Sequence, residues 1–464
     1  MIGLIKRHKT MLSPTRQIII SFLLVIMLGA GLLSLPFANA VAPLTFLDYL
    51  FIATSATCVT GLFPVEITDQ FTLWGQLIIL ILMQIGGLGF LTFLYLLLGK
   101  IQKKLTLRRK MVLQEMLNYT SISNSSLMLR RILTYTFATQ GIGVLLFMPV
   151  FVSSYGMLRG LYYSIFHSVS SFTNAGITVF STSSLMTYRH HPYMLMTTSL
   201  MIILGGLGFI VWYDFLQVMQ QQKTSIRPFS MKRLFTKLSL HSKIVMVMTG
   251  FLLVSGALLL FILERNNVQT IGEFSMFDQL LNSFFLSVSS RTAGFTTFST
   301  EYLNISSQLI LWLYMFIGGS PTGTAGGIKT TTFMMTVLMI YYLYQGKKEI
   351  QIFKRSIHQK LVIRCFAIVS MALFVIFAAL IMLSYTENIP FIHLTAEVLS
   401  AFTTVGFSHQ ITANLTVIGY IIFMLLMFVG RLGPITMLIS FVNKSQEQKE
   451  KKEVGYPKED FIMG

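Results

Sequence analysis

Apolar stretches of about 20 residues recur along the whole chain, separated by shorter polar segments. A helix needs about 20 apolar residues to cross the hydrocarbon core of a bilayer, so each stretch predicts a transmembrane helix. We expect eight spans, at 17–38, 72–98, 132–153, 194–216, 244–263, 307–343, 363–385 and 415–442. The first run is too long for a signal-peptide core and lacks a convincing cleavage site, so we interpret it as a retained span. The pattern predicts an all-α integral membrane protein.

The composition agrees with this prediction. Of the 464 residues, 54% are hydrophobic and only 11% are charged, whereas soluble domains carry about 25% charged residues. A water-soluble enzyme is therefore excluded. Cys58 and Cys365 lie in or beside apolar segments and indicate neither a disulfide framework nor a metal site.

The distribution of basic residues predicts the topology. If the N-terminus is cytoplasmic, 29 of the 35 Lys and Arg residues fall in cytoplasmic segments, as the positive-inside rule requires. We expect a multi-pass protein of the bacterial plasma membrane with both termini in the cytoplasm. The net charge of +18 then reflects topology and contact with anionic membrane lipid rather than nucleic acid. A partner-docking surface on the basic loops is the minority interpretation.

A short turn motif recurs once in each segment between an odd and an even span. The four turns are Thr57-Cys58-Val59-Thr60-Gly61, Thr173-Asn174-Ala175-Gly176, Arg291-Thr292-Ala293-Gly294 and Thr403-Thr404-Val405-Gly406. The apolar stretches before the turns are 46–56, 161–172, 277–290 and 394–402. These stretches are too short to span a bilayer and predict re-entrant half-helices.

Glycines in the even spans repeat in register with the turns. They are Gly86-Gly87, Gly205-Gly206, Gly318-Gly319 and Gly430 with Gly433. Two weak motifs that recur together four times indicate four copies of one unit. We expect four tandem helix–re-entrant pore helix–helix repeats around a pseudo-fourfold pore. Close helix packing through small residues is the competing interpretation of the inner-helix glycines.

The repeats define the expected organisation of the chain. The repeats cover 17–99, 132–220, 244–345 and 363–442; the cytoplasmic segments are 1–16, 100–131, 221–243, 346–362 and 443–464.

The turns have the chemistry of a cation filter. Backbone carbonyls replace the water shell of an ion without burying a fixed charge, and glycine tolerates the positive φ that such a turn requires. The expected filter residues are Val59, Thr60, Gly61, Asn174, Ala175, Gly176, Thr292, Ala293, Gly294, Thr404, Val405 and Gly406. We expect K⁺ to bind through these backbone carbonyls only.

The third even span contains a run that opposes helix formation, because glycine and proline cost about 1 and 3 kcal/mol relative to alanine. We expect a broken helix over 318–332 that obstructs the pore. The expected gate residues are Gly318, Gly319, Ser320, Pro321, Thr322, Gly323, Thr324, Ala325, Gly326, Gly327 and Lys329. Packing at the glycines and snorkelling of Lys329 to the surface are the competing interpretations.

These motifs, with Gln84-Ile85-Gly86-Gly87-Leu88-Gly89-Phe90 and the ending Tyr456-Pro457, resemble the Trk/Ktr/HKT superfamily of potassium transporters. The chain most resembles the bacterial Ktr-type membrane subunit, since it starts directly with the first repeat, whereas Trk-type members carry an additional helix pair. The resemblance implies an intramembrane gate, a homodimer and a cytosolic nucleotide-binding ring of RCK-type subunits. It also implies that Arg431 lies below the filter and raises the barrier for cations. We expect Arg291 to bind carbonyls or carboxylates that brace its turn.

Other functions have weaker support. A proton-coupled transporter would need ionisable groups within the spans, and only Asp214, near a cytoplasmic end, qualifies. An enzyme would need a nucleophile, a metal cluster or paired acids, and none is visible, so we expect neither catalysis nor a covalent cofactor. A Na⁺-coupled K⁺ carrier with alternating access is the main alternative to a channel-like pathway.

Overall fold

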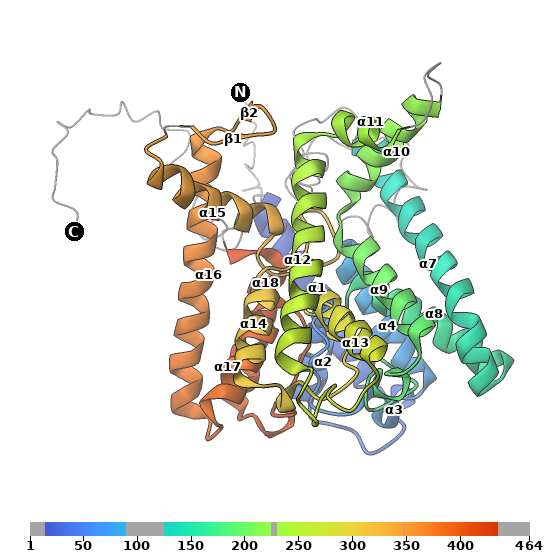
Figure 1. Ribbon diagram of the computed structural model, residues 1–464. Coiled ribbons are helices and arrows are strands. Elements are labelled where there is room, and N and C mark those ends of the chain that lie inside the picture. Colours follow the sequence, from blue (N-terminus) through green and yellow to red (C-terminus); the bar gives the residue numbers. More distant parts are fainter. Residues whose placement is uncertain (1–13, 90–124, 224–229, 348, 435–464) are drawn as a thin grey trace, which may run out of the picture.

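The computed structural model describes residues 14–89, 125–223, 230–347 and 349–434. The described residues are almost wholly helical, with one short antiparallel hairpin of β1 (Gln351–Ile352) and β2 (Arg355–Ser356) at one end (Figure 1). The all-α prediction is therefore confirmed. The expected cytoplasmic segments 1–16 and 100–131 lie largely outside the described residues, and 443–464 lies wholly outside them.

Four long helices open the repeats. They are α1 (Pro14–Leu33), α7 (Ser125–Tyr155), α12 (Leu240–Glu264) and α16 (Gln359–Thr386). In the described part of the chain these are the four single helices long and apolar enough to cross a membrane. Each carries large exposed apolar side chains, such as Leu28, Leu145, Phe251 and Phe374. Such a surface is stable against lipid rather than water.

Four half-helices follow at the predicted places. They are α2 (Phe46–Cys58), α8 (Met157–Thr173), α13 (Met276–Ser289) and α17 (Phe391–Thr403). Their starts are fixed by side-chain caps in two cases: Thr45 forms a capping box with Asp48, and Ser275 accepts a hydrogen bond from the Asp278 amide. Three of them end at a residue with left-handed backbone, which stops the helix and turns the chain.

The second membrane helix of each repeat ends at or beside the glycines of that repeat. These helices are α4 (Leu73–Leu88), α9 (Pro192–Gly206), α14 (Ile305–Phe316) and α18 (Val417–Leu432). Glycines with positive φ follow three of them, namely Gly89, Gly208 and Gly433. A left-handed glycine ends a helix readily, because it has no Cβ to clash. In the two Gly-Gly-Leu-Gly-Phe motifs, at 86–90 and 205–209, it is the last glycine that has positive φ and follows the end of the helix.

The continuous span predicted over 194–216 is wrong. The chain bends by 94° between α9 and α10 (Phe209–Lys223), at Gly208 with a φ of +92°. The break predicted in the third repeat is confirmed, because residues 317–329 separate α14 from α15 (Thr330–Tyr344). The second and third repeats thus both have interrupted inner helices.

The remaining elements are short connections. They are α3 (Ile67–Gln70), α11 (Met231–Lys237), and the 3-10 turns η1 (Pro36–Ala38), η2 (Met186–Tyr188), η3 (Thr300–Tyr302) and η4 (Thr412–Asn414).

Contacts between repeats follow a closed circle. The inner helix of each repeat packs on the half-helix of the next: α4 on α8, α9 on α13, α14 on α17, and α18 back on α2. This order gives the molecule its pseudo-fourfold arrangement, with the half-helices in the lower part of the view (Figure 1).

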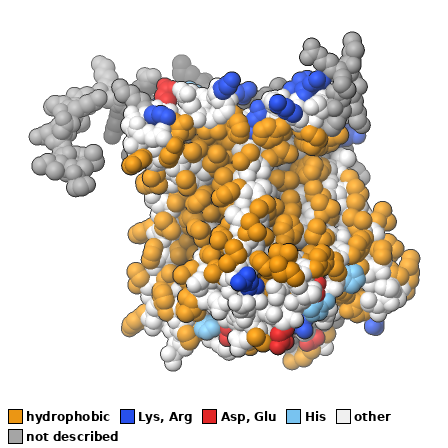
Figure 2. All heavy atoms as spheres, viewed as in Figure 1, with side chains coloured by type: hydrophobic (Ala, Val, Ile, Leu, Met, Phe, Trp, Pro, Cys, Tyr) orange, Lys and Arg blue, Asp and Glu red, His pale blue; other side chains and the backbone are white. Residues whose placement is uncertain are grey.

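The surface separates charge by position. Figure 2 shows a broad apolar belt, with Lys and Arg gathered at the upper edge, near α11 and the β1–β2 hairpin, and most visible Asp, Glu and His side chains near the lower edge. The half-helices thus lie toward the edge that carries the carboxylates.

Candidate functional site

The four turn glycines meet in a closed ring. At each one, an added side-chain carbon would overlap the backbone carbonyl of the next turn. The pairs are Gly61 with Ala175, Gly176 with Ala293, Gly294 with Val405, and Gly406 with Thr60. Each partner directly precedes the glycine of its own turn, so the contacts run through all four repeats and return to the first. The structure therefore brings together all four turns that the sequence singles out.

The turns have an unusual backbone. In every turn the glycine and the residue two positions before it both have positive φ; the earlier residues are Val59, Asn174, Thr292 and Thr404. Positive φ is rare for β-branched residues such as Val59, Thr292 and Thr404. Strained backbone of this kind costs about 1–3 kcal/mol per residue and clusters at functional sites.

A serine in each half-helix holds its turn in place. Ser55, Ser170 and Ser400 accept hydrogen bonds through their Oγ atoms from the amides of Gly61, Ile177 and Gly406, at 3.1, 2.9 and 3.0 Å. In the third turn Ser289 Oγ instead donates to the Phe295 carbonyl, at 2.6 Å. None of these serines is among the expected filter residues, although Ser55, Ser170 and Ser400 each lie six residues before the turn glycine, a signal that is visible in the sequence.

The turn amides and carbonyls differ in their partners. The amides of Thr60, Ala175 and Val405 donate to the carbonyls of the same three serines, each at 2.9 Å. Within the described residues, no recorded hydrogen bond ends on a carbonyl of residues 59–61, 174–176, 292–294 or 404–406. A ring of carbonyl oxygens without protein donors suits a ligand that accepts electron pairs, which is the chemistry of a dehydrated cation.

The inner-helix glycines support the half-helices. At Gly86, Gly205 and Gly430, an added side-chain carbon would overlap a backbone carbonyl of a half-helix. These carbonyls belong to Thr57, Phe172 and Phe402 respectively, each four residues before its turn glycine. The packing interpretation therefore holds for these three. In the third repeat, Gly318 instead lies against the Gly326 carbonyl, within the 317–329 segment.

The 317–329 segment folds back on itself and fills the break in the second repeat. Ile317 and Ile328 form a parallel bridge. The amides of Ser320 and Thr324 donate to the Gly206 and Gly205 carbonyls, at 3.0 and 3.2 Å. Because α9 stops at Gly206, these carbonyls have no intrahelical donor and accept bonds from the segment instead.

The same segment lies beside the turns. Thr324 Oγ1 donates to the Phe172 carbonyl at the end of α8, at 3.0 Å. A side-chain carbon at Gly326 would overlap Thr404 Oγ1 and lie 3.1 Å from the Thr403 carbonyl. The segment is thus in contact with the end of α8, directly before the second turn, and with the fourth turn.

Two cations contact this segment. Lys329 Nζ donates to the Ala325 carbonyl at 2.7 Å, so its side chain turns back onto the segment and does not snorkel to the surface. The Arg431 guanidinium donates to the carbonyls of Thr324 and Gly86. Arg431 therefore joins the fourth repeat to the segment of the third and to the inner helix of the first.

Arg291 does not have the partners expected of it. Its side chain is buried, and among the described residues its recorded bond is a long one, 3.5 Å, to the Thr249 hydroxyl. The expected carbonyl or carboxylate partners are absent from this part of the chain, so that prediction is wrong. Arg291 lies deep between α12 and its own turn.

A buried carboxylate that is not among the expected site residues braces the fourth turn. Glu397 lies in the second turn of α17 and is fully buried. Its oxygens accept bonds from Ser408 Oγ, the His409 amide and Thr412 Oγ1, at 2.8, 3.0 and 2.5 Å. The signal was a single acid inside the apolar stretch 394–402. Glu397 ties the chain leaving the turn to the half-helix that enters it.

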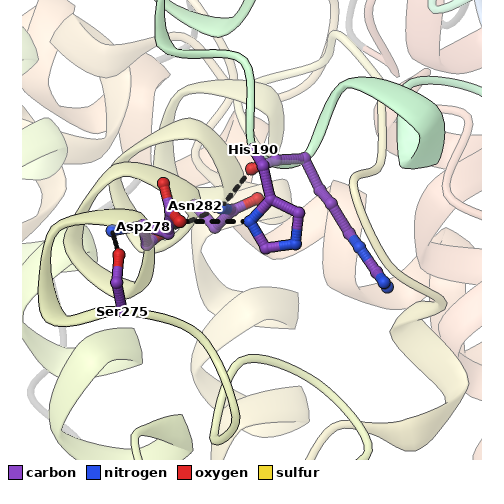
Figure 3. Close-up of polar contacts among 5 residues, drawn as sticks. His190, Ser275, Asp278 and Asn282 are labelled. Carbon is purple, nitrogen blue, oxygen red and sulfur yellow. Dashed lines mark hydrogen bonds and ion pairs between the residues drawn. The ribbon is translucent and has the colours of Figure 1, made fainter.

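A contact between the second and third repeats lies at the lower edge. His190 Nδ1 is 3.1 Å from Asp278 Oδ2, and Asn282 donates to the Arg189 carbonyl at 2.9 Å (Figure 3). The histidine is half exposed, and Asp278 belongs to the first turn of α13. The His190–Asp278 pair and the hydrogen bond from the Asn282 side chain together hold the connection after the second turn against the third half-helix.

The fold and the apolar belt define a multi-pass membrane protein built of four repeats whose turns meet in one ring. The chain belongs to the TrkH family of cation transport proteins, whose model matches residues 6–452. It is a family of transporters and not of enzymes.

Individual relatives are similar over their whole lengths. The chain is 36% identical to the potassium/sodium uptake protein NtpJ of Enterococcus hirae, over 99% of both chains. It is 35% identical to the Ktr system potassium uptake protein B of Bacillus subtilis, over 97% of both chains. Its fold matches the crystal structure of the potassium transporter TrkH from Vibrio parahaemolyticus, with a TM-score of 0.73 at 18% identity, over 95% of this chain and 87% of that one.

Proposed function

We propose that this chain is the ion-conducting subunit of a potassium uptake system and that K⁺ passes through the ring of four turns. The single observation that carries the proposal is the closed circle of glycine-to-carbonyl contacts. Four turns from one chain complete such a ring, so one copy supplies the whole filter. Potassium appears in the names of the E. hirae and B. subtilis relatives.

The carbonyls of the turns act as ligands in this proposal. The serine braces hold the turn amides toward the half-helices, so the carbonyl oxygens are left to replace the water of a K⁺ ion. The half-helices end at the turns, and their C-terminal partial negative charge favours a cation there. A membrane potential of 100 mV supplies about 2.3 kcal/mol per inward charge, enough to drive accumulation.

The 317–329 segment acts as the gate. It contacts the end of α8 through Thr324 and the fourth turn through Gly326, and hydrogen bonds to the end of α9 hold it in place. Arg431 fastens the segment and places a positive charge beside it, which raises the barrier for cations until the segment moves. Glycines at 318, 319, 323, 326 and 327 give the segment the freedom to change conformation.

The assembly extends beyond one chain. We propose a homodimer with both termini in the cytoplasm, the half-helices on the outer side, and a cytosolic nucleotide-binding ring of RCK type on the basic face. The gathering of Lys and Arg at the edge opposite the half-helices supports this orientation (Figure 2). The B. subtilis relative's name places it in a "Ktr system", which supports a partner subunit.

A sodium-coupled potassium carrier is the second candidate, because the E. hirae relative is named for both ions. Flux into liposomes containing the purified chain separates the two. Tracer K⁺ entry, driven by voltage with no Na⁺ on either side, is the result expected of the channel-like pathway. An absolute Na⁺ requirement with a fixed stoichiometry would establish the carrier, and no flux with any gradient would refute both.

A further inference from the structure

Two histidines face each other next to the fourth turn. Neither has a role in the proposed ion pathway. His393 lies in the first turn of α17, and His409 lies in the connection that follows Gly406. Their Nδ1 atoms are 2.8 Å apart, and the ring planes cross at 76°. Two imidazoles make this contact only if one Nδ1 carries a proton and the other presents a lone pair. Both ring nitrogens therefore point at one position, which a single proton occupies.

A transition-metal ion uses the same lone pairs. Neutral imidazole nitrogen is the commonest protein ligand for such metals, and zinc binds it at about 2.0–2.1 Å in tetrahedral geometry. Tetrahedral ligands at that length lie about 3.3 Å apart. The two Nδ1 atoms would have to separate by only about half an ångström, and the protonated ring would move its proton to Nε2. Ion binding thus needs a small adjustment and no new fold.

Hydrogen bonds to Glu397 fix the chain on which one of the two histidines lies. The carboxylate of Glu397, four residues after His393 on the same helix, accepts the His409 amide at 3.0 Å and fixes the connection through Ser408 and Thr412. His409 is 8% exposed, while His393 is half-buried and open to one side.

We propose that His393 and His409 form a binding site for a divalent transition-metal ion, with Zn²⁺ as the probe and water completing the coordination. No group of three or more His, Cys, Asp or Glu able to hold a metal occurs among the described residues, so this is a two-ligand site of moderate affinity. The ion would cross-link the fourth half-helix to the chain leaving the fourth turn, three residues after Gly406. The site does not depend on the transported ion.

The test measures metal binding and not transport. The full chain, purified with an affinity tag that contains no histidine, competes for Zn²⁺ with a chromophoric chelator. Wild type is expected to bind one equivalent that H393A and H409A each lose. Removing a ligand should weaken binding at least as much as removing a second-shell partner, about 10- to 100-fold. H190A, which removes an exposed histidine elsewhere on the same edge, should bind as wild type does.

A second variant separates ligation from a merely structural role. H393C replaces the imidazole with a softer thiolate, so binding should persist and shift in preference toward Cd²⁺. Zn²⁺ should raise the melting temperature of wild type and not of H393A. If H409A fails to fold, H393A and H393C decide the question, because His393 is the more exposed ligand. Equal Zn²⁺ affinity in wild type and H393A, or no binding by wild type, would overturn the proposal.

Discussion

Gly406 of the fourth turn lies against the carbonyl oxygen of Thr60 in the first turn, so close that a side-chain carbon at position 406 would overlap it. This contact closes the circle of four turns between the last and first repeats of one chain. It also requires glycine, because the φ of Gly406 is +93°. The ring thus restricts which residue can occupy the position.

Substitutions of Arg431 test the proposed gate. Its guanidinium donates to the Thr324 and Gly86 carbonyls at once, a fork that a lysine ammonium cannot reproduce with the same geometry. R431A should raise K⁺ flux in the absence of any cytosolic partner, and R431K should raise it less, because the charge stays while one bond is lost. Tracer flux in proteoliposomes measures both. Equal flux in wild type and R431A would contradict the role assigned to Arg431.

Removing residues 322–327 should leave an ungated leak. The deletion takes away the contacts of Thr324 with Phe172 and of Gly326 with Thr404, which place the segment beside the turns. Electrical recording in planar bilayers should show a larger and less regulated K⁺ conductance. The account of the gate fails if the conductance of the deletion variant responds to a regulatory partner as wild type does.

The close approach of the inner-helix glycines to the half-helices predicts that a larger residue there lowers the stability of the protein. G430A places a methyl group onto the Phe402 carbonyl, and overpacking of this kind costs about 1–3 kcal/mol. The melting temperature of the detergent-purified chain should fall. G141A is the matched control, because nothing lies within 4 Å of that position in α7 and alanine favours a helix. Similar melting temperatures for the two variants would show that the backbone approach at Gly430 is not tight.

Glu397 can be tested with an isosteric change. In E397Q the negative charge is lost and an NH₂ group replaces one oxygen, so the charge-assisted bonds from Ser408, Thr412 and the His409 amide weaken, and an NH₂ group that faces the His409 amide leaves both donors unpaired. A buried polar group left unpaired costs about 1–3 kcal/mol. We expect a lower melting temperature and a weaker preference for K⁺ over Na⁺, while E387Q, at the end of α16, serves as a comparison away from the turn. An unchanged preference in E397Q would remove Glu397 from the support of the turn.

Much of the fold could be predicted from the sequence, because its signals repeat. The half-helices, the four turns and the break near Pro321 follow from apolar length and from glycine and proline placement. The break at Gly208 could not be predicted as readily, since a glycine can either pack helices together or end one, and only its φ of +92° decides. The same ambiguity applies to Gly89 and Gly433, at which α4 and α18 end.

The meeting of the four turns could be predicted from the sequence, whereas the partners of the side chains around them could not. Four glycines in register indicate a ring, but which serine braces a turn depends on the rotation of each half-helix. Arg291 contacts a hydroxyl of α12 in its own repeat and not the expected carbonyls, and Lys329 turns back onto the Ala325 carbonyl, because a long flexible side chain can reach several partners and the packing around it selects one. Glu397 was visible in the sequence, and its three partners were not.

The most direct test of the central claim is the K⁺ to Na⁺ permeability ratio of proteoliposomes that contain the purified chain. G61S and G294S put a side chain where the φ is +91° and +72° and where the carbonyls of Ala175 and Val405 already lie, whereas G250S changes a glycine with open space around it. The account predicts that the ratio falls in G61S and G294S and stays at the wild-type value in G250S. A ratio that is unchanged in all three variants would contradict the assignment of the four turns as the potassium filter.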